Sequence, residues 1–163
     1  MHSVCIIRQR RPVARSPHRV PVQRSVAMKR HDALKPLSRD HHLTLKLARR
    51  LESSEPVQAL QAELKGHVQG LAEHFAAEEA IAERALVTCG RDATLVEQVG
   101  RMCREHREIE GLIQDFLGQA PEEPRLSTAQ RLGACLAAHV RFEERELFNR
   151  LQDGCLGGHG TAA

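Results

Sequence analysis

Apolar residues recur at helical spacing along most of the chain and group into four segments. Leucine, alanine, valine and isoleucine return every three or four positions, which places them on one face of an α-helix. The segments cover about residues 33–53, 56–88, 93–118 and 128–151. Gly66 and Gly70 weaken the second segment, so we expect its first part to be irregular. The pattern predicts an all-α protein with four amphipathic helices.

Residues that cap or interrupt helices separate the four segments. Ser53–Pro56 combines capping serines with a proline suited to a first helical turn. Cys89-Gly90 ends the second segment, Asp92 caps the third, and Ser127–Gln130 is a capping box for the fourth. Helices joined by short loops pack against their neighbours in opposite directions. The expected fold is an antiparallel up-down four-helix bundle.

The chain divides into a basic extension over 1–29, a bundle over 30–152 and a flexible tail over 153–163. Residues 1–27 contain six arginines, three prolines and no acid, and show no apolar period. A transit peptide and a nucleic-acid-binding arm are two interpretations of this segment. We favour a third, a disordered extension that precedes a native start at Met28, because the organised pattern begins directly after that residue.

Charge and cysteine content narrow the function classes. The overall charge is +3, and the first 27 residues contribute +6, so the bundle itself is mildly acidic. A bundle without a basic face argues against binding nucleic acid, and no apolar run is long enough for a membrane span. The five cysteines include no CxxC pair, and we see no secretory signal. Reduced thiols in a cytoplasmic protein are the simplest interpretation.

Four evenly spaced histidines carry the candidate chemistry. They lie 33, 32 and 33 residues apart, and glutamate follows three of them at the fourth position. The residues are His41, His74 with Glu78, His106 with Glu110, and His139 with Glu143. Residues four apart lie one turn apart on the same helix face. A histidine and a glutamate so placed can bind one metal ion from one helix.

Helical phase places these side chains on the apolar faces of the predicted helices. A single His-x-x-x-Glu pair is commonly a surface ion pair, and a single inward histidine is commonly a hydrogen-bonded core residue. Seven polar groups on core-facing stripes would cost several kcal/mol of desolvation unless they share a partner. We therefore predict a metal site. In the first helix, phase favours His41 over the adjacent His42, which remains the alternative ligand.

Four further residues lie within two turns of the predicted ligands. Cys103 and Cys135 precede His106 and His139 by about one turn, but small buried thiols are most often simple core residues. His67 and Glu146 lie two turns from ligands. They are candidates for orienting a ligand or lining an iron or proton path, with structural hydrogen bonding as the equal alternative.

The motifs resemble those of the hemerythrin-like, HHE cation-binding domains. The resemblance covers about residues 30–151 and rests on four stretches of the chain. They are Leu37-Ser38-Arg39-Asp40-His41, His74-Phe75-Ala76-Ala77-Glu78-Glu79, Glu105-His106, and His139-Val140-Arg141-Phe142-Glu143-Glu144-Arg145-Glu146-Leu147-Phe148. The resemblance implies a four-helix bundle around an oxo- or hydroxo-bridged, non-haem di-iron centre.

Carried onto this chain, the resemblance implies a specific ligand set. His41 and His74 would bind one iron, His106 and His139 the other, and two glutamates would bridge them. The bridging glutamates would be Glu78 and Glu143. Manganese or zinc are further possible metals.

One position departs from the oxygen-carrying hemerythrins, whose third helix supplies a second histidine where this chain has Glu110. We expect Glu110 to bind metal as a seventh ligand. A carboxylate there favours ferric over ferrous iron, which argues against simple oxygen carriage.

The expected function is to bind or sense O2, NO or peroxide. The alternatives are a di-iron redox enzyme of oxidative or nitrosative stress defence, an iron storage or sensing protein, and a metal-free helical scaffold. The sequence does not decide whether the protein is an enzyme, and it names no protein partner.

Overall fold

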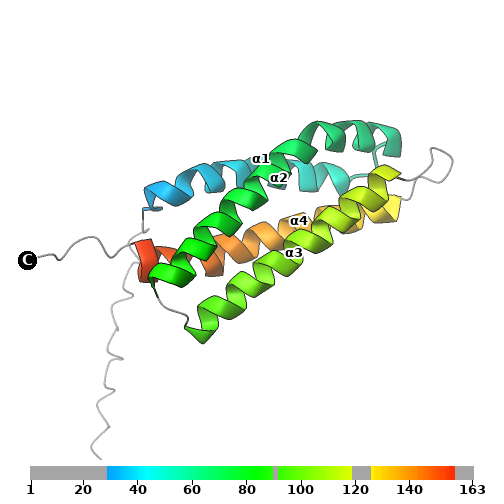
Figure 1. Ribbon diagram of the computed structural model, residues 1–163. Helices are drawn as coiled ribbons and strands as arrows, with labels where there is room; N and C mark the ends of the chain where they lie inside the picture. Colours follow the sequence, from blue (N-terminus) through cyan, green and yellow to red (C-terminus); the bar gives the residue numbers. More distant parts are fainter. Residues whose placement is uncertain (1–28, 90–91, 119–125, 157–163) are drawn as a thin grey trace, which may run out of the picture.

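The computed structural model describes residues 29–89, 92–118 and 126–156. Four long helices account for most of them, and no strand occurs within these ranges. The first three are α1 (Lys35–Leu51), preceded by the single turn η1 (Asp32–Leu34), then α2 (Val57–Thr88) and α3 (Ala93–Gly118). The fourth begins as α4 (Leu126–Phe142) and continues without a break through the π-helical turn η2 (Glu143–Leu147), α5 (Phe148–Leu151) and the π-helical turn η3 (Gln152–Leu156). The helices lie lengthwise beside one another, so the predicted all-α four-helix bundle is confirmed (Figure 1).

Two apolar clusters form the core, one on each side of a buried polar layer. One cluster includes Leu51, Leu64, Phe116 and Leu132. The other includes Leu34, Ala82, Met102 and Leu147. Along α1 and α3 the second cluster precedes the histidine of the polar layer, and along α2 and the fourth helix it follows it. The alternation shows that successive helices run in opposite directions.

The fourth and first helices approach closely at Gly133. A Cβ atom there would lie 2.6 Å from the carbonyl oxygen of Ala48 and 2.9 Å from Cγ of Glu52. These distances are shorter than van der Waals contact, so only glycine fits without a shift of the α1 backbone. Gly133 therefore sets the spacing between α1 and α4 beside the core.

The predicted cap of α3 is confirmed, whereas the predicted irregularity within α2 is not. Asp92 caps α3, because its Oδ1 accepts hydrogen bonds from the backbone N–H groups of Thr94 (2.9 Å) and Leu95 (3.0 Å). The expected irregularity around Gly66 and Gly70 was wrong, since α2 is continuous across both glycines. Packing of the inner face of α2 outweighs the weak intrinsic propensity of the two residues.

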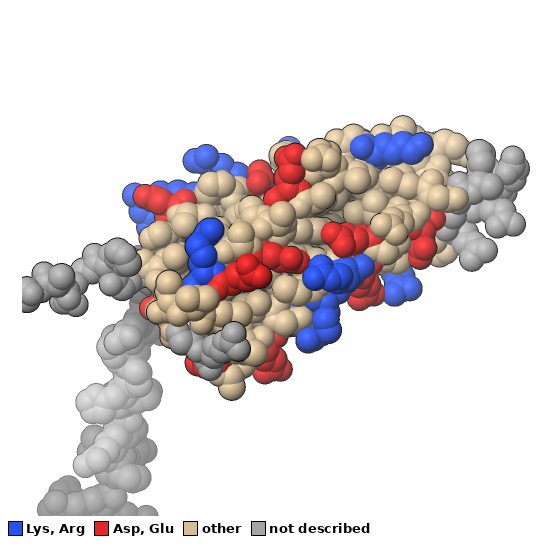
Figure 2. Space-filling model, viewed as in Figure 1, with Lys and Arg blue, Asp and Glu red and all other residues tan. Residues whose placement is uncertain are grey.

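The predicted end segments lie largely outside the described residues. Of the extension expected over 1–29, only Lys29 is described. The tail expected from residue 153 begins as helix, because η3 extends to Leu156, and its later residues are not described. No helix in the described ranges combines the length and apolar character needed to cross a membrane. On the face shown in Figure 2, acidic and basic side chains are interspersed.

Candidate metal centre

Six buried polar side chains meet in the layer between the two apolar clusters. At most 6% of any of them is exposed. They are His41, His74, Glu78, His106, His139 and Glu143. Their ligand atoms form two groups of four, in each of which all atoms lie within 4.8 Å of one another. Both groups contain Glu78 and Glu143; one adds His41 and His74, and the other adds His106 and His139.

The two carboxylates span the two groups. Oε1 of Glu78 lies 3.0 Å from Nε2 of His74 and 3.1 Å from Nε2 of His41, while its Oε2 lies 3.3 Å from Nε2 of His106. Oε2 of Glu143 lies 3.1 Å from Nε2 of His41 and 3.3 Å from Nε2 of His139. Every histidine thus directs Nε2 at a carboxylate oxygen, and each carboxylate faces histidines of both groups.

Several atoms of this centre are buried without a hydrogen-bond partner. They are Oε2 of Glu78, both carboxylate oxygens of Glu143, Nε2 of His106 and His139, and the outer nitrogen Nδ1 of His74. Leaving such atoms unpaired in a protein interior costs about 1–3 kcal/mol each. Imidazole nitrogens and carboxylate oxygens at this spacing suit divalent or trivalent metal ions such as iron and manganese. Metal cations fit the donor set and would satisfy the unpaired carboxylate oxygens and Nε2 atoms together.

Two aromatic rings hold imidazoles of the centre in place. Phe75 stacks on His106 with ring centroids 4.1 Å apart, and Phe148 stacks on His41 at 5.3 Å. Both phenylalanines are at most 4% exposed. They close the centre from either side and fix the plane of the ring on which each lies.

Helix geometry explains why Glu110 does not join this centre. The side chain four residues along is rotated by about 40° from its partner. On α2 and the fourth helix this rotation carries Glu78 and Glu143 towards the middle of the buried stripe. On α3 the stripe lies on the other side of His106, through Ile109 and Ile113, so the same rotation carries Glu110 to the surface. The expectation of a seventh ligand at Glu110 is therefore not met.

The structure separates the two adjacent histidines of α1. His41 is 2% exposed and points into the centre, whereas His42 lies on the exposed face of the helix. Six of the seven predicted ligands therefore come together, with His41 as the histidine from α1.

A second set of carboxylates surrounds the centre and contacts the outer nitrogens of the histidines. We call Asp40, Glu79, Glu105 and Glu144 the outer carboxylates. Glu144 lies 2.8 Å from Nδ1 of His41, Glu79 lies 3.0 Å from Nδ1 of His106, and Glu105 lies 2.9 Å from Nδ1 of His139. Asp40 makes the longest contact, 3.6 Å to Nδ1 of His74.

The outer carboxylates form a closed circuit around the bundle. Each one reaches from its own helix to a histidine on the next, so that α1 contacts α2, α2 contacts α3, α3 contacts α4, and the fourth helix returns to α1. A carboxylate on Nδ1 keeps the proton there and leaves the lone pair of Nε2 free to bind a metal. His41, His106 and His139 are thereby oriented by a neighbouring helix, whereas Nδ1 of His74, 3.6 Å from Asp40, has no hydrogen-bond partner.

A family model described as the hemerythrin HHE cation binding domain matches residues 27–151. The chain belongs to the hemerythrin HHE family. No curated protein and no solved structure matches it. Among the described residues of this HHE domain, the buried histidines and glutamates form groups that could hold a metal cation.

The buried carboxylates of the metal-free HHE centre need positive charge nearby to balance them. Burial acts to lower the pKa of His41, but the nearby carboxylates of Glu143, Glu144 and Glu78 outweigh it and raise the pKa to about 11. Burial acts to raise the pKa of Glu144, yet His41, Ser38 and Arg30 lower it to about 2. His41 thus carries a proton in the position where a cation would bind.

The two central glutamates cannot both ionise freely. Burial and the charge of Glu78 raise the pKa of Glu143 to about 7, although its histidine contacts oppose the rise. Burial also acts against ionisation of Glu78, but the neighbouring imidazoles of His106, His41 and His74 hold its pKa well below the usual value. The pair behaves as two coupled carboxylates of which Glu78 ionises first. Cations that neutralise both would replace the protons held in the metal-free centre.

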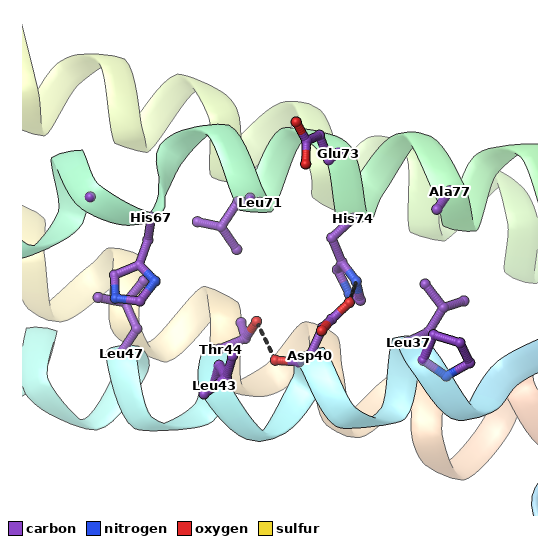
Figure 3. A pocket seen from close by; sticks show the side chains of 13 residues that line it. Leu37, Asp40, Leu43, Thr44, Leu47, His67, Leu71, Glu73, His74 and Ala77 are labelled. Carbon is purple, nitrogen blue, oxygen red and sulfur yellow. Dashed lines mark hydrogen bonds and ion pairs between the residues drawn. The ribbon is translucent and has the colours of Figure 1, made fainter.

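A groove between α1 and α2 leads to His74. It has a volume of about 400 Å³ and is lined by apolar side chains together with His67, Glu73, Asp40 and His74. In Figure 3, His74 and Leu71 project from α2 towards Asp40 and Thr44 of α1. Gly66 and Gly70 line the groove as well, and no atom lies within 4 Å of where their Cβ atoms would be. The absence of two side chains keeps the groove open beside the His41–His74 group.

The residues predicted from the sequence to lie beside the ligands are not the outer carboxylates, which the sequence did not reveal. His67 lines the groove, and Cys135 lies with Glu105 and His139 beside a smaller hollow. Glu146 is 54% exposed, with its nearest described cation, on Arg101, 4.0 Å away. The outer carboxylates had one available signal, since each is adjacent in sequence to a ligand. Asp40 and Glu105 precede a ligand histidine, and Glu79 and Glu144 follow a ligand glutamate.

Proposed function

We propose that this HHE domain holds two iron ions between its helices and uses them to bind or sense O2, NO or a peroxide. The observation that carries the proposal is the pair of overlapping four-residue groups that share Glu78 and Glu143. Two shared carboxylates flanked by two histidines on each side are donors for two ions. Mixed imidazole and carboxylate donors suit iron or manganese better than copper or zinc.

The residues give each ion the same protein donors, namely two histidines and the two shared glutamates. Glu110 as a seventh ligand, as predicted from the sequence, would have given one ion an extra protein donor. With Glu110 at the surface, four donor groups remain for each ion, which leaves room for a small molecule. When bound, a pair of iron ions supplies electrons and Lewis acidity to such a molecule.

The two ions would have the same number of protein ligands, but a small molecule would not reach both of them equally. The groove between α1 and α2 ends beside His74, whereas Phe75 stacks on His106 of the other group. A small molecule would therefore reach the ion held by His41 and His74. The apolar walls of the groove favour uncharged molecules such as O2, NO and hydrogen peroxide.

The outer carboxylates support a second candidate, a redox enzyme that consumes peroxide or NO. Reduction of these molecules to water or other products requires protons, which must cross the apolar core. The side chains of Glu79, Glu105 and Glu144 are 32%, 25% and 28% exposed, yet each contacts a buried imidazole. They link the centre to solvent and give protons a path through Nδ1 of the histidines.

Metal analysis combined with optical spectroscopy tests the proposal. We expect two iron ions per chain, and an absorption band in the near-ultraviolet or visible range when anaerobically reduced protein meets air or NO. His41→Ala should lower the iron content, and the matched variant His42→Ala should not. One ion per chain, or two colourless zinc ions and no spectral response, would contradict the proposal. Steady-state consumption of peroxide or NO with a reductant then separates the enzyme from the sensor.

A further inference from the structure

Two thiols line one hollow at the end of the bundle remote from the α1–α2 turn. Cys89 directly follows the last residue of α2, and Cys155 lies in the terminal turn η3. Both line a hollow of about 530 Å³ together with Asp92, Leu95 and Arg150. The two cysteines are separated by α3 and α4 in sequence, but the antiparallel fold brings them to the same site.

The end of α2 and the C-terminal turns are held in position by contacts other than one between the two sulfurs. Nη1 of Arg150 lies 3.2 Å from Oδ2 of Asp92, which joins α5 to the start of α3. The hydroxyl of Thr88 lies 3.3 Å from Sγ of Cys89. Leu151 is buried in the apolar cluster at this end of the bundle, and Cys155 packs against it. The hollow is therefore a built feature of the fold.

The two sulfurs differ in exposure. Cys89 is exposed, and Cys155 is half-buried. Burial and the neighbouring Cys89 thiol raise the pKa of Cys155 to about 12. Cys89 is the more exposed of the two, so it is the thiol that an oxidant in solution meets first. Cys155 lies beside it, in the position of a resolving thiol.

We propose that Cys89 and Cys155 form a reversible intramolecular disulfide when the protein meets a hydroperoxide. The Cys89 thiolate attacks one oxygen of hydrogen peroxide, the O–O bond breaks, and the other oxygen leaves as hydroxide that takes up a proton to become water. Sulfur from Cys155 then attacks the Cys89 sulfenic acid, the S–O bond breaks, and a second water leaves with the proton of the Cys155 thiol. Two thiols lose two electrons, and one peroxide becomes two waters.

The bond would fasten the C-terminal turns to the end of α2. The segment from α5 to η3 covers the apolar cluster that contains Phe148, the ring stacked on His41. Oxidation would add a covalent tie to the contacts that already hold this cover in place. The site uses none of the metal ligands, so it stands independently of the proposed function.

A variant with only the two relevant thiols provides the test. In the full chain, Cys5→Ser, Cys103→Ser and Cys135→Ser together leave Cys89 and Cys155. Equimolar hydrogen peroxide should lower the intact mass by two hydrogen atoms, keep the chain monomeric on a non-reducing gel, and remove both thiols from alkylation. Dithiothreitol should restore both. In the unsubstituted chain, peptide mapping should link the peptide of Cys89 to that of Cys155.

One further substitution and a chelator provide the controls. With Cys155→Ser in addition, Cys89 should stop at the sulfenic acid and react with dimedone. Retention of both thiols, addition of oxygen without loss of two hydrogens, or disulfide-linked dimers would overturn the proposal. The reaction should proceed equally with a chelator present. A disulfide that forms only in metal-loaded protein would overturn direct attack on the peroxide.

Discussion

Oε1 of Glu144 and Nδ1 of His41 lie 2.8 Å apart, although the two residues are 103 positions apart in the chain. The same glutamate pairs through Oε2 with Arg30 at 2.6 Å. Glu144 thus connects a surface cation to the imidazole of a buried centre. The contact orients His41 by a group that is not itself a ligand.

Replacing Glu144 by glutamine should weaken metal binding without unfolding the bundle. Glutamine keeps the shape of the side chain but loses the charge that stabilises the Nδ1 proton of His41. Loss of such a partner typically costs about 10–100-fold in metal affinity. Competition titration with a chelator measures it. Glu146→Gln, two residues along and 54% exposed, is the matched control and should leave affinity unchanged. Equal effects from both variants would argue against an orienting role.

The two glutamates at the i+4 positions of α3 and the fourth helix should differ sharply on substitution. Glu143→Ala removes a carboxylate shared by both groups, so we expect loss of both ions. Glu110→Ala removes an exposed side chain and should leave two ions bound. Metal content after gel filtration distinguishes the two. Loss of an ion from the Glu110 variant would return that residue to the ligand set.

Metal-free and metal-loaded protein should respond to pH in opposite directions. In the folded metal-free protein, the pKa of Glu143 is raised to about 7, so its stabilising protonated form is lost as pH rises from 4.5 through 7. The pKa of His41 is raised to about 11, so its contribution is complete below 6.5 and is lost progressively as pH rises towards 11. Glu144, whose pKa is lowered to about 2, destabilises only as pH falls from 4.5 through 2.

Between pH 5.5 and 8.5 the metal-free protein should therefore lose several kcal/mol of unfolding free energy. Metal ions bind the deprotonated ligands, so the loaded protein should gain stability over the same interval. Thermal unfolding at the two pH values, with and without metal, measures both slopes. A metal-free protein that becomes more stable at pH 8.5 would contradict the protonation of His41.

Alanine at Gly133 should destabilise the bundle, whereas alanine at Gly111 should not. The added Cβ at position 133 would lie 2.6 Å from a backbone oxygen of α1, and overpacking of this kind costs about 1–3 kcal/mol. No atom lies within 4 Å of the corresponding position at Gly111, so alanine there should stabilise by about 0.5–1 kcal/mol. Denaturant unfolding of the metal-loaded variants compares the two, and equal effects would mean that the α1–α4 approach can relax.

Filling the groove should slow access to the centre without removing metal. Leucine at Gly70 would place its side chain between α1 and α2 beside the path to His74. We expect unchanged iron content and an NO association rate lowered several-fold, measured by stopped-flow absorbance. Gly111→Leu, at an exposed position of α3, is the control. An unchanged rate in the Gly70 variant would show that small molecules enter elsewhere.

The bundle and six of the central residues follow from helical phase within single segments. Apolar residues at three- and four-residue spacing define the inner faces, and the equal spacing of the histidines places them at one level. Glu110 shows the limit of this reasoning. Glu110 follows His106 by four residues, so helical phase predicted that it points inward. The middle of the buried stripe of α3, through Ile109 and Ile113, lies on the other side of His106 from Glu110.

The outer carboxylates depend on how each helix is rotated towards its neighbours, which a single segment does not reveal. Asp40 is a neighbour of His41 in sequence, yet it contacts His74 on another helix. The close approach at Gly133 and the hollow shared by Cys89 and Cys155 likewise depend on contacts between helices distant in sequence.

The circuit of outer carboxylates also selects between two ways of arranging the same four helices. An up-down bundle can wind clockwise or anticlockwise, and an apolar core alone discriminates weakly between the two. With the opposite winding, Asp40 would project towards the fourth helix and Glu144 towards α3, and neither would meet its present histidine. The polar contacts around the centre thus favour one handedness of the bundle. A chain folded with the opposite handedness could still bury its apolar core, but its histidines would not be oriented to bind metal.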